Sequence, residues 1–183
     1  MSKEQAIDLF CSGRKEEALE VFERLLEKGV EDADVFCHLG IIHENKGNYA
    51  ESIDFYNKAL DLKPNLVPAL ANLGNLLASS GHLSLASEKL QKAYGLDPRN
   101  SAICSNFANV LVSMAEHKKA YKQFLNFLNI TPHNIYAFSS FLLSLNYNEL
   151  SSPDEVFEYH KNFSNSIGEK KTDRQAYSHD KLR

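Results

Sequence analysis

Asparagine side chains recur at a fixed spacing in the middle of this 183-residue chain. Asn72 and Asn106 lie 34 residues apart, and so do Asn75 and Asn109. The side-chain amide of asparagine offers one acceptor and two donors, so a row of amides can pair with the backbone of an extended peptide without reading its side chains. Because asparagine is a mediocre helix former, its repetition in segments expected to be helical favours a binding role. The alternative is that two related copies share surface residues by descent.

The asparagines belong to a longer repeat of 34 residues. Three copies of this unit cover residues 33–134 without a gap, and a shortened copy over residues 1–32 precedes them. Three sets of residues recur at this 34-residue spacing. They are the prolines Pro64, Pro98 and Pro132, the small residues Ala18, Ser52, Ala86 and Ala120, and the large residues Phe22, Tyr56, Leu90 and Phe124. A period of this length is typical of proteins built from stacked helix pairs.

Each unit has the apolar spacing of two amphipathic helices. The expected helices lie near 33–46, 49–62, 67–80, 83–96, 101–114 and 117–130. Small residues at unit positions 8 and 20, such as Gly40 and Ala86, allow the two helices to approach closely. The residue at position 24, such as Tyr56, is expected to fill the space between one hairpin and the next. Glycine at position 15 ends the first helix, and proline at position 32 ends the second.

The pattern of Leu39-Gly40 and Leu73-Gly74, followed by a small residue at 20, alanine at 27 and proline at 32, resembles the tetratricopeptide (TPR) family. The resemblance implies an all-α fold, a right-handed solenoid of about four helix hairpins with a C-terminal capping helix pair. Positions 2, 5, 6 and 9 of each first helix would face the concave side. The candidate peptide-binding residues are therefore Asn72, Asn75, Asn106 and Asn109, with His38 and Ser140 at position 6 of the flanking repeats. Clamps for a terminal carboxylate use lysine and arginine there, and these positions carry neither in repeats two to four.

The repeat pattern changes after residue 134. Residues 135–167 are predicted to form two divergent capping helices, the first over Ile135–Leu145. The segment Ser152-Pro153-Asp154-Glu155 is a capping box that starts a helix to about residue 166. Its apolar face would carry Val156, Phe157, His160 and Phe163. Residues 168–183 are polar and are expected to form a flexible tail or linker.

The run from Ser139 to Tyr147, followed by Ser152-Pro153, Val156-Phe157 and His160, resembles the junction between repeats and catalytic region in bacterial O-linked N-acetylglucosamine transferases of the SPINDLY type. This resemblance implies the N-terminal acceptor-recognition arm of a UDP-N-acetylglucosamine-dependent protein glycosyltransferase, whose catalytic domain would follow in the same polypeptide. The asparagine row also resembles the asparagine ladder of those arms. The alternative is a stand-alone TPR adaptor or scaffold without an attached enzyme. Under both interpretations the partner is a protein or peptide.

Composition and motifs exclude several other classes. The formal net charge of −4 does not suggest a nucleic-acid binder, and no run of 18 apolar residues predicts a membrane span. The three cysteines and the absence of a signal peptide favour free thiols in the cytoplasm. No phosphate-binding, zinc-binding or redox motif is present, so no cofactor, metal or catalytic residue is expected in this chain. Residues 1–32 carry nine acids and five bases, which predicts a solvated end cap or an acidic docking face.

Overall fold

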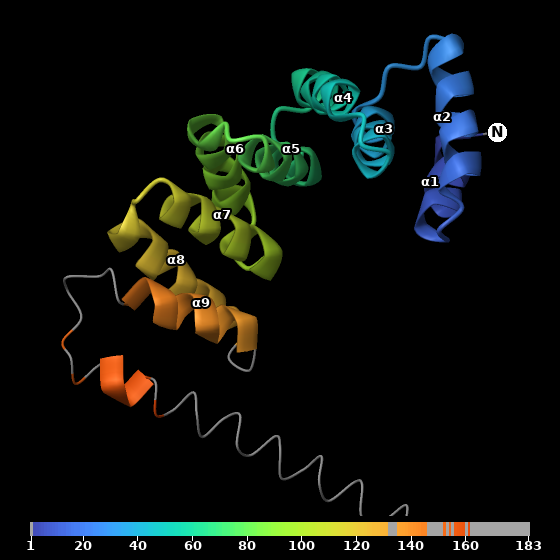
Figure 1. The fold of residues 1–183 in the computed structure, drawn as a ribbon. Helices are drawn as coiled ribbons and strands as arrows, with labels where there is room; N and C mark the ends of the chain where they lie inside the picture. The colour runs from blue at the N-terminus through green and yellow to red at the C-terminus, as the bar shows by residue number, and fades with distance from the viewer. Residues whose placement is uncertain are drawn as a thin grey trace, which may run out of the picture. The chain divides into compact units, whose positions relative to one another are not determined.

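The computed structural model describes residues 2–131, 135–145, 152, 154, 156–159 and 161, with the backbone alone for 135–138. No strand occurs among these residues, and the all-α fold is confirmed. The helices run in chain order as shown in Figure 1: α1 Lys3–Cys11, α2 Lys15–Glu27, α3 Ala33–Asn45, α4 Tyr49–Leu62, α5 Val67–Ser79, α6 Leu83–Leu96, α7 Ser101–Ser113, α8 His117–Ile130 and α9 Ile135–Leu145. The bounds agree with the sequence-based ranges to within a residue.

The helix boundaries follow from local side-chain and backbone chemistry. Ser2 and Gln5 form a reciprocal capping box at the start of α1. Asp32 accepts hydrogen bonds from two backbone amides at the start of α3, and Asn100 does the same for α7. Beyond the end of α3, Gly47 has a φ of 80°, a left-handed conformation that glycine adopts without steric cost.

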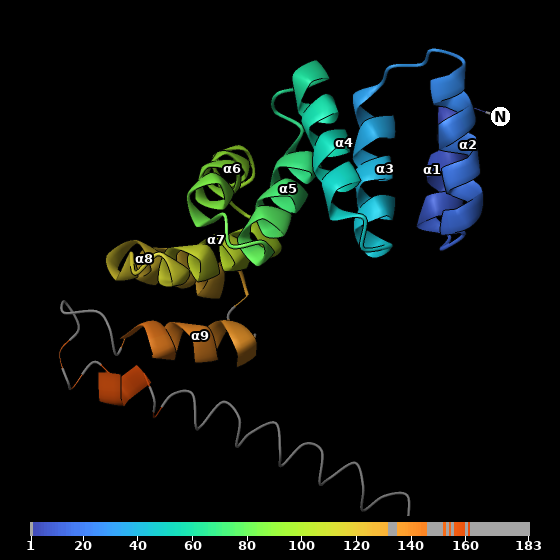
Figure 2. The ribbon, with the colours of Figure 1, turned by 45° about the horizontal axis from the view of Figure 1, so that its top comes forward.

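The chain divides into two compact units, Met1–Pro98 and Arg99–Arg183. The first contains the hairpins α1–α2, α3–α4 and α5–α6, and the second contains α7, α8 and α9. Figure 2 shows the two helices of the second hairpin, α3 and α4, side by side. Buried apolar residues line the facing helices of each hairpin, including Val35, Leu39, Leu73 and Leu90 in the first unit and Ile103, Leu111 and Phe124 in the second.

Polar contacts also hold the second hairpin together. The hydroxyl of Ser52 on α4 is buried and donates a hydrogen bond of 2.8 Å to the carbonyl oxygen of Gly40 on α3. One turn later, the Tyr56 hydroxyl donates to a carboxylate oxygen of Glu44 at 2.7 Å. Burial, followed by this carboxylate, raises the pKa of Tyr56 above its ordinary value, so the phenol stays protonated and keeps donating.

Some of the described residues after α9 are helical. Positions 154, 156–159 and 161 are helical, and the Val156 amide donates to the Ser152 carbonyl oxygen at 3.1 Å. The ring of Tyr159 meets Phe141 of α9 edge-on at 4.9 Å between centroids, whereas Phe157 is 64% exposed. The predictions for Pro132, Asn146, Tyr147, His160, Phe163 and residues 168–183 lie outside the described residues.

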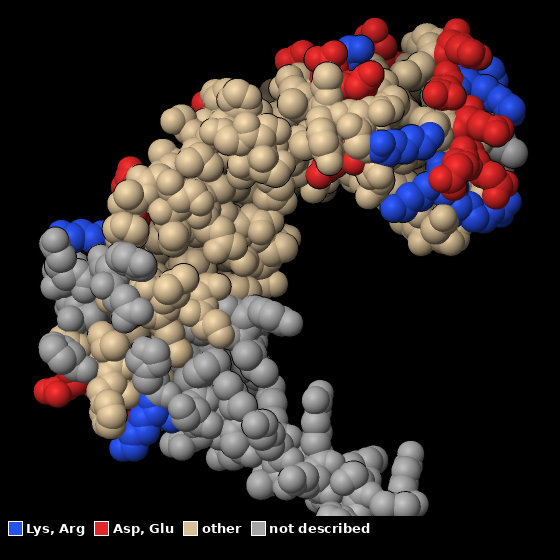
Figure 3. Space-filling view, viewed as in Figure 1, with Lys and Arg blue, Asp and Glu red and all other residues tan. Residues whose placement is uncertain are grey.

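Charged side chains gather at the first hairpin. In Figure 3, Asp, Glu, Lys and Arg cover much of the visible surface of α1 and α2. Some of these charges pair locally, as Arg14 does with Glu17 and Arg24 with Glu20. Within the described part of the chain, no helix is long and apolar enough to span a membrane.

Candidate peptide-binding site

Two of the predicted asparagines lie on α5 in the first unit. Asn72 and Asn75 are three residues apart, so they are neighbours on the helix surface, and both are partly exposed. Apolar residues around them in the same helix, Leu70, Leu73 and Leu76, are buried. The asparagines are therefore at the edge of the packed face, where an amide can meet another molecule without disturbing the core.

His38 is engaged within the first unit. Its imidazole lies 5.0 Å from the ring of Phe10, edge to face, and 5.6 Å from the ring of Phe22, in a stacked arrangement. Its Nδ1 lies 2.7 Å from the carbonyl oxygen of Asp34 in the preceding helical turn. His38 thus contributes to the packing of α3 against α1 and α2, a role that its place in the asparagine row did not predict.

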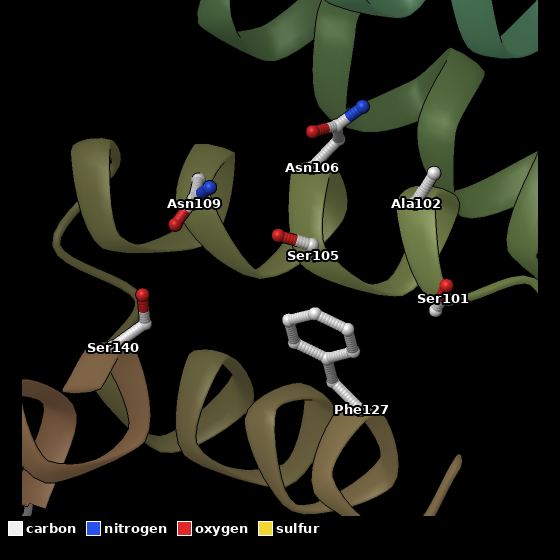
Figure 4. A pocket seen from close by; sticks show the side chains of 7 residues that line it. All are labelled: Ser101, Ala102, Ser105, Asn106, Asn109, Phe127 and Ser140. Carbon is white, nitrogen blue, oxygen red and sulfur yellow. The ribbon is translucent and has the colours of Figure 1, made fainter. Parts of the chain in front are cut away.

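The second unit contains a pocket of about 390 Å³ that includes the other predicted residues. Asn106 and Asn109 of α7 and Ser140 of α9 all line it. Figure 4 shows these side chains together with the remaining lining residues, which are Ser101, Ala102, Ser105 and Phe127. Three of the predicted residues therefore lie around one pocket in this unit.

The polar groups around this pocket are available to another molecule. Asn106 is partly exposed, Asn109 is exposed, and their side-chain amides have no hydrogen-bond partner in the part of the chain that the structure describes. The lining side chains in the described part of the chain are neutral. Chemically, these residues offer amide and hydroxyl donors and acceptors near an aromatic ring.

Phe127 is an aromatic lining residue that was not among the predicted site residues. It occupies unit position 27, where the two preceding repeats have Ala59 and Ala93. Both alanines are fully buried, and Phe127 remains 6% exposed and reaches the pocket from α8. The departure from alanine at this position was a signal in the sequence that could have identified the pocket.

The described residues contain no group of three or more histidine, cysteine, aspartate or glutamate side chains arranged to hold a metal ion. Cys37 and Cys104 are buried in their helices and Cys11 is exposed, and all three are free thiols.

The repeats and their hairpin packing define a helical-repeat fold of the TPR type. Residues 3–66, which include the first two repeats, match the family model described as tetratricopeptide repeat. No curated protein matches the sequence.

Solved structures of MamA share this fold. A crystal structure of MamA has a TM-score of 0.77 and 22% identity, with 91% of this chain and 96% of that chain covered. MamA 41-end from Desulfovibrio magneticus RS-1 has a TM-score of 0.76 and 16% identity, with 92% and 93% covered. At this level of identity the likeness establishes the fold.

Proposed function

We propose that this protein binds an extended segment of a partner protein. The binding surface is the exposed face of the first helix in each repeat. The observation that carries the proposal is the pocket of the second unit, which is lined by Asn106, Asn109 and Ser140. These three residues were selected from the repeat pattern alone, and they line one concavity. Their amides and hydroxyl can bond the peptide backbone, which every extended segment carries.

The proposal includes Asn72 and Asn75, which hold the same unit positions in the preceding repeat. A backbone-directed site of this kind tolerates different peptide sequences and depends little on salt, because its bonds involve no net charge. His38 would contribute less than the asparagines, because its ring already packs against Phe10 and Phe22.

The test is a titration of wild type and the Asn72→Ala/Asn106→Ala double variant against two extended peptides of unrelated sequence. Such peptides can be selected by panning a displayed library on the wild-type protein. Each neutral hydrogen bond contributes about 0.5–1.5 kcal/mol, so removing both amides should weaken both peptides on the order of tenfold. The variant should fold at least as well as wild type, since alanine is the better helix former. Equal affinities of both proteins would make the asparagines an inherited surface feature.

We further propose that the partner segment is the acceptor of an O-linked N-acetylglucosamine-type transfer, catalysed by a domain of the same polypeptide. The support is the resemblance of residues 139–160 to the junction that precedes the catalytic region in SPINDLY-type enzymes. A stand-alone adaptor with the same peptide site is the competing proposal. The natural reading frame distinguishes them: several hundred further residues with a nucleotide-sugar-binding pattern favour the transferase, and a stop codon soon after Arg183 favours the adaptor.

A further inference from the structure

We infer that the pocket of the second unit selects a tyrosine side chain of the bound peptide, an inference that rests on the proposed peptide site and adds a sequence preference to it. A row of asparagines alone would contact only the backbone of the bound peptide. The pocket between α7, α8 and α9 is different, because its volume of about 390 Å³ lies in the range of sites that enclose a side chain or small ligand.

The described lining residues favour a neutral occupant. Among the residues that the structure describes, serine, asparagine, alanine and phenylalanine side chains line the pocket, and none of these carries a charge. An ionised side chain entering the pocket would lose water without gaining an opposite charge, which is unfavourable. The occupant is therefore expected to be neutral.

Phe127 favours an aromatic occupant. Figure 4 shows its ring directed from α8 toward Ser105 of α7. Aromatic rings attract one another in offset or edge-to-face arrangements beyond the effect of burial alone. Leu143 lies three residues after Ser140, hence beside it on the surface of α9, and is 56% exposed, which adds an apolar surface near the pocket.

The polar groups of the pocket favour tyrosine over phenylalanine. The hydroxyls of Ser105 and Ser140 and the amides of Asn106 and Asn109 are donors and acceptors at the wall. A phenol that enters an apolar site usually finds such a partner for its hydroxyl group. The residues equivalent to Phe127 in the two preceding repeats are Ala59 and Ala93. The preference for an aromatic side chain therefore belongs to the fourth repeat alone.

The first test uses p-cresol, which is the tyrosine side chain as a free molecule. The full chain, labelled with nitrogen-15, is titrated with p-cresol while its backbone amide signals are recorded by NMR. We expect saturable shifts centred on Ser105, Asn106 and Asn109, with a dissociation constant on the order of 1 mM for a ligand of this size. Toluene, which lacks the hydroxyl group, should bind about two- to fivefold more weakly. Acetate and methylammonium should not bind there.

Variants connect these shifts to the pocket. Ser105→Leu places a larger side chain in the pocket from α7 and should abolish the p-cresol shifts. If this variant folds poorly, Asn109→Leu, at an exposed position, serves the same purpose. Ala71→Leu, at the equivalent position of the preceding repeat, is the matched control and should leave them unchanged. Shifts spread over the whole chain, or unaltered in both pocket variants, would overturn the inference.

A second test separates this inference from the proposed function. In a selected peptide, replacing the tyrosine by alanine should weaken binding about tenfold, and replacing it by phenylalanine about two- to fivefold. Ser105→Leu should remove this preference. If selected peptides bind without any preference for tyrosine and p-cresol leaves the pocket signals unmoved, the inference fails and the backbone site stands. If p-cresol binds in the pocket but panning yields no peptide, the pocket stands and the proposed function fails.

Discussion

The ring of Tyr56 occupies the space that a side chain on Gly40 would need. A Cβ atom built on Gly40 would lie 2.6 Å from both Cδ1 and Cε1 of Tyr56. Tyr56 is fully buried, and its hydroxyl is fixed by Glu44. The same relationship joins Gly74 to Leu90 in the next hairpin, where the nearest side-chain atom is Cγ at 2.6 Å. Contact between unit positions 8 and 24 is thus a property of the repeat.

Gly40→Ala is expected to destabilise the protein. The added methyl group would overlap a buried ring that cannot swing away, and overpacking of this kind typically costs about 1–3 kcal/mol. Gly95→Ala is the matched control, because Gly95 lies in α6 and a Cβ atom added there would meet no neighbouring atom within 4 Å. Alanine there should stabilise the helix by up to about 1 kcal/mol. Urea unfolding of both variants measures the difference, and a Gly40→Ala variant as stable as wild type would contradict the packing described here.

Much of the fold was predictable because its signals are local. Glycine and proline end the helices, and a small residue at positions 8 and 20 pairs helices within a repeat, so boundaries and hairpins could be derived from the spacing. Contacts between side chains of different helices were harder. Tyr56 was expected to lie between hairpins, and its close packing on Gly40 of its own hairpin was not predicted. The spacing predicts on which face of its helix a residue lies. The sizes of the neighbouring side chains decide which residue it contacts.

The candidate site was predictable to a similar degree. Asn106, Asn109 and Ser140 share one pocket, as unit positions 6 and 9 of neighbouring repeats suggest. His38 occupies position 6 as well, but the aromatic rings of Phe10 and Phe22 recruit it into packing. The repeat pattern does not predict this packing role of His38, because the two rings that it contacts belong to the shortened first repeat.

Ala115→Gly is expected to stabilise the protein. Ala115 has a φ of 57°, at the repeat position where Gly13, Gly47 and Gly81 have values of 84°, 80° and 82°. A residue with a Cβ atom pays about 1–2 kcal/mol in this conformation, and glycine avoids most of that cost while adding freedom to the unfolded chain. The net gain should be about 0.5–1 kcal/mol in urea unfolding. Gly81→Ala, the reverse change one repeat earlier, should destabilise by a similar amount. Destabilisation of Ala115→Gly would mean that unfolded-state entropy outweighs the strain.

The three thiols are expected to differ sharply in reactivity. Burial, and then the charge of Asp34, raises the pKa of Cys37 to about 12, so almost no nucleophilic thiolate forms at neutral pH. Cys104 is also buried, whereas Cys11 is exposed. A disulfide reagent such as Ellman's should therefore modify Cys11 quickly in the native protein, and the other two only after unfolding. Cys11→Ser should eliminate the fast phase. Rapid modification of more than one thiol in native wild type would contradict the burial of Cys37 and Cys104.

The start of α3 is expected to make the protein sensitive to acid. Burial by itself raises the pKa of Asp32, but the hydrogen bond from Lys3 at 2.8 Å and those from the amides of Val35 and Asp34 outweigh it and hold the pKa below its usual value. The hydrogen bond to Asp32 in turn raises the pKa of Lys3.

A depressed carboxyl pKa means that the folded state favours the ionised form. The stabilisation is therefore present at pH values above the unfolded pKa of about 3.9 and is lost as the pH falls through the lower folded pKa. Asp32→Asn keeps an oxygen that can cap α3 but removes the charge, so it should lower the free energy of unfolding at pH 7 by about 0.5–1 kcal/mol. Below the folded pKa of Asp32 the variant and wild type should converge. Asp54→Asn, on the exposed surface of α4, is the control and should show neither effect. Urea unfolding across this pH range measures the difference, and parallel curves for wild type and Asp32→Asn would show that the Lys3–Asp32 pair contributes nothing to stability.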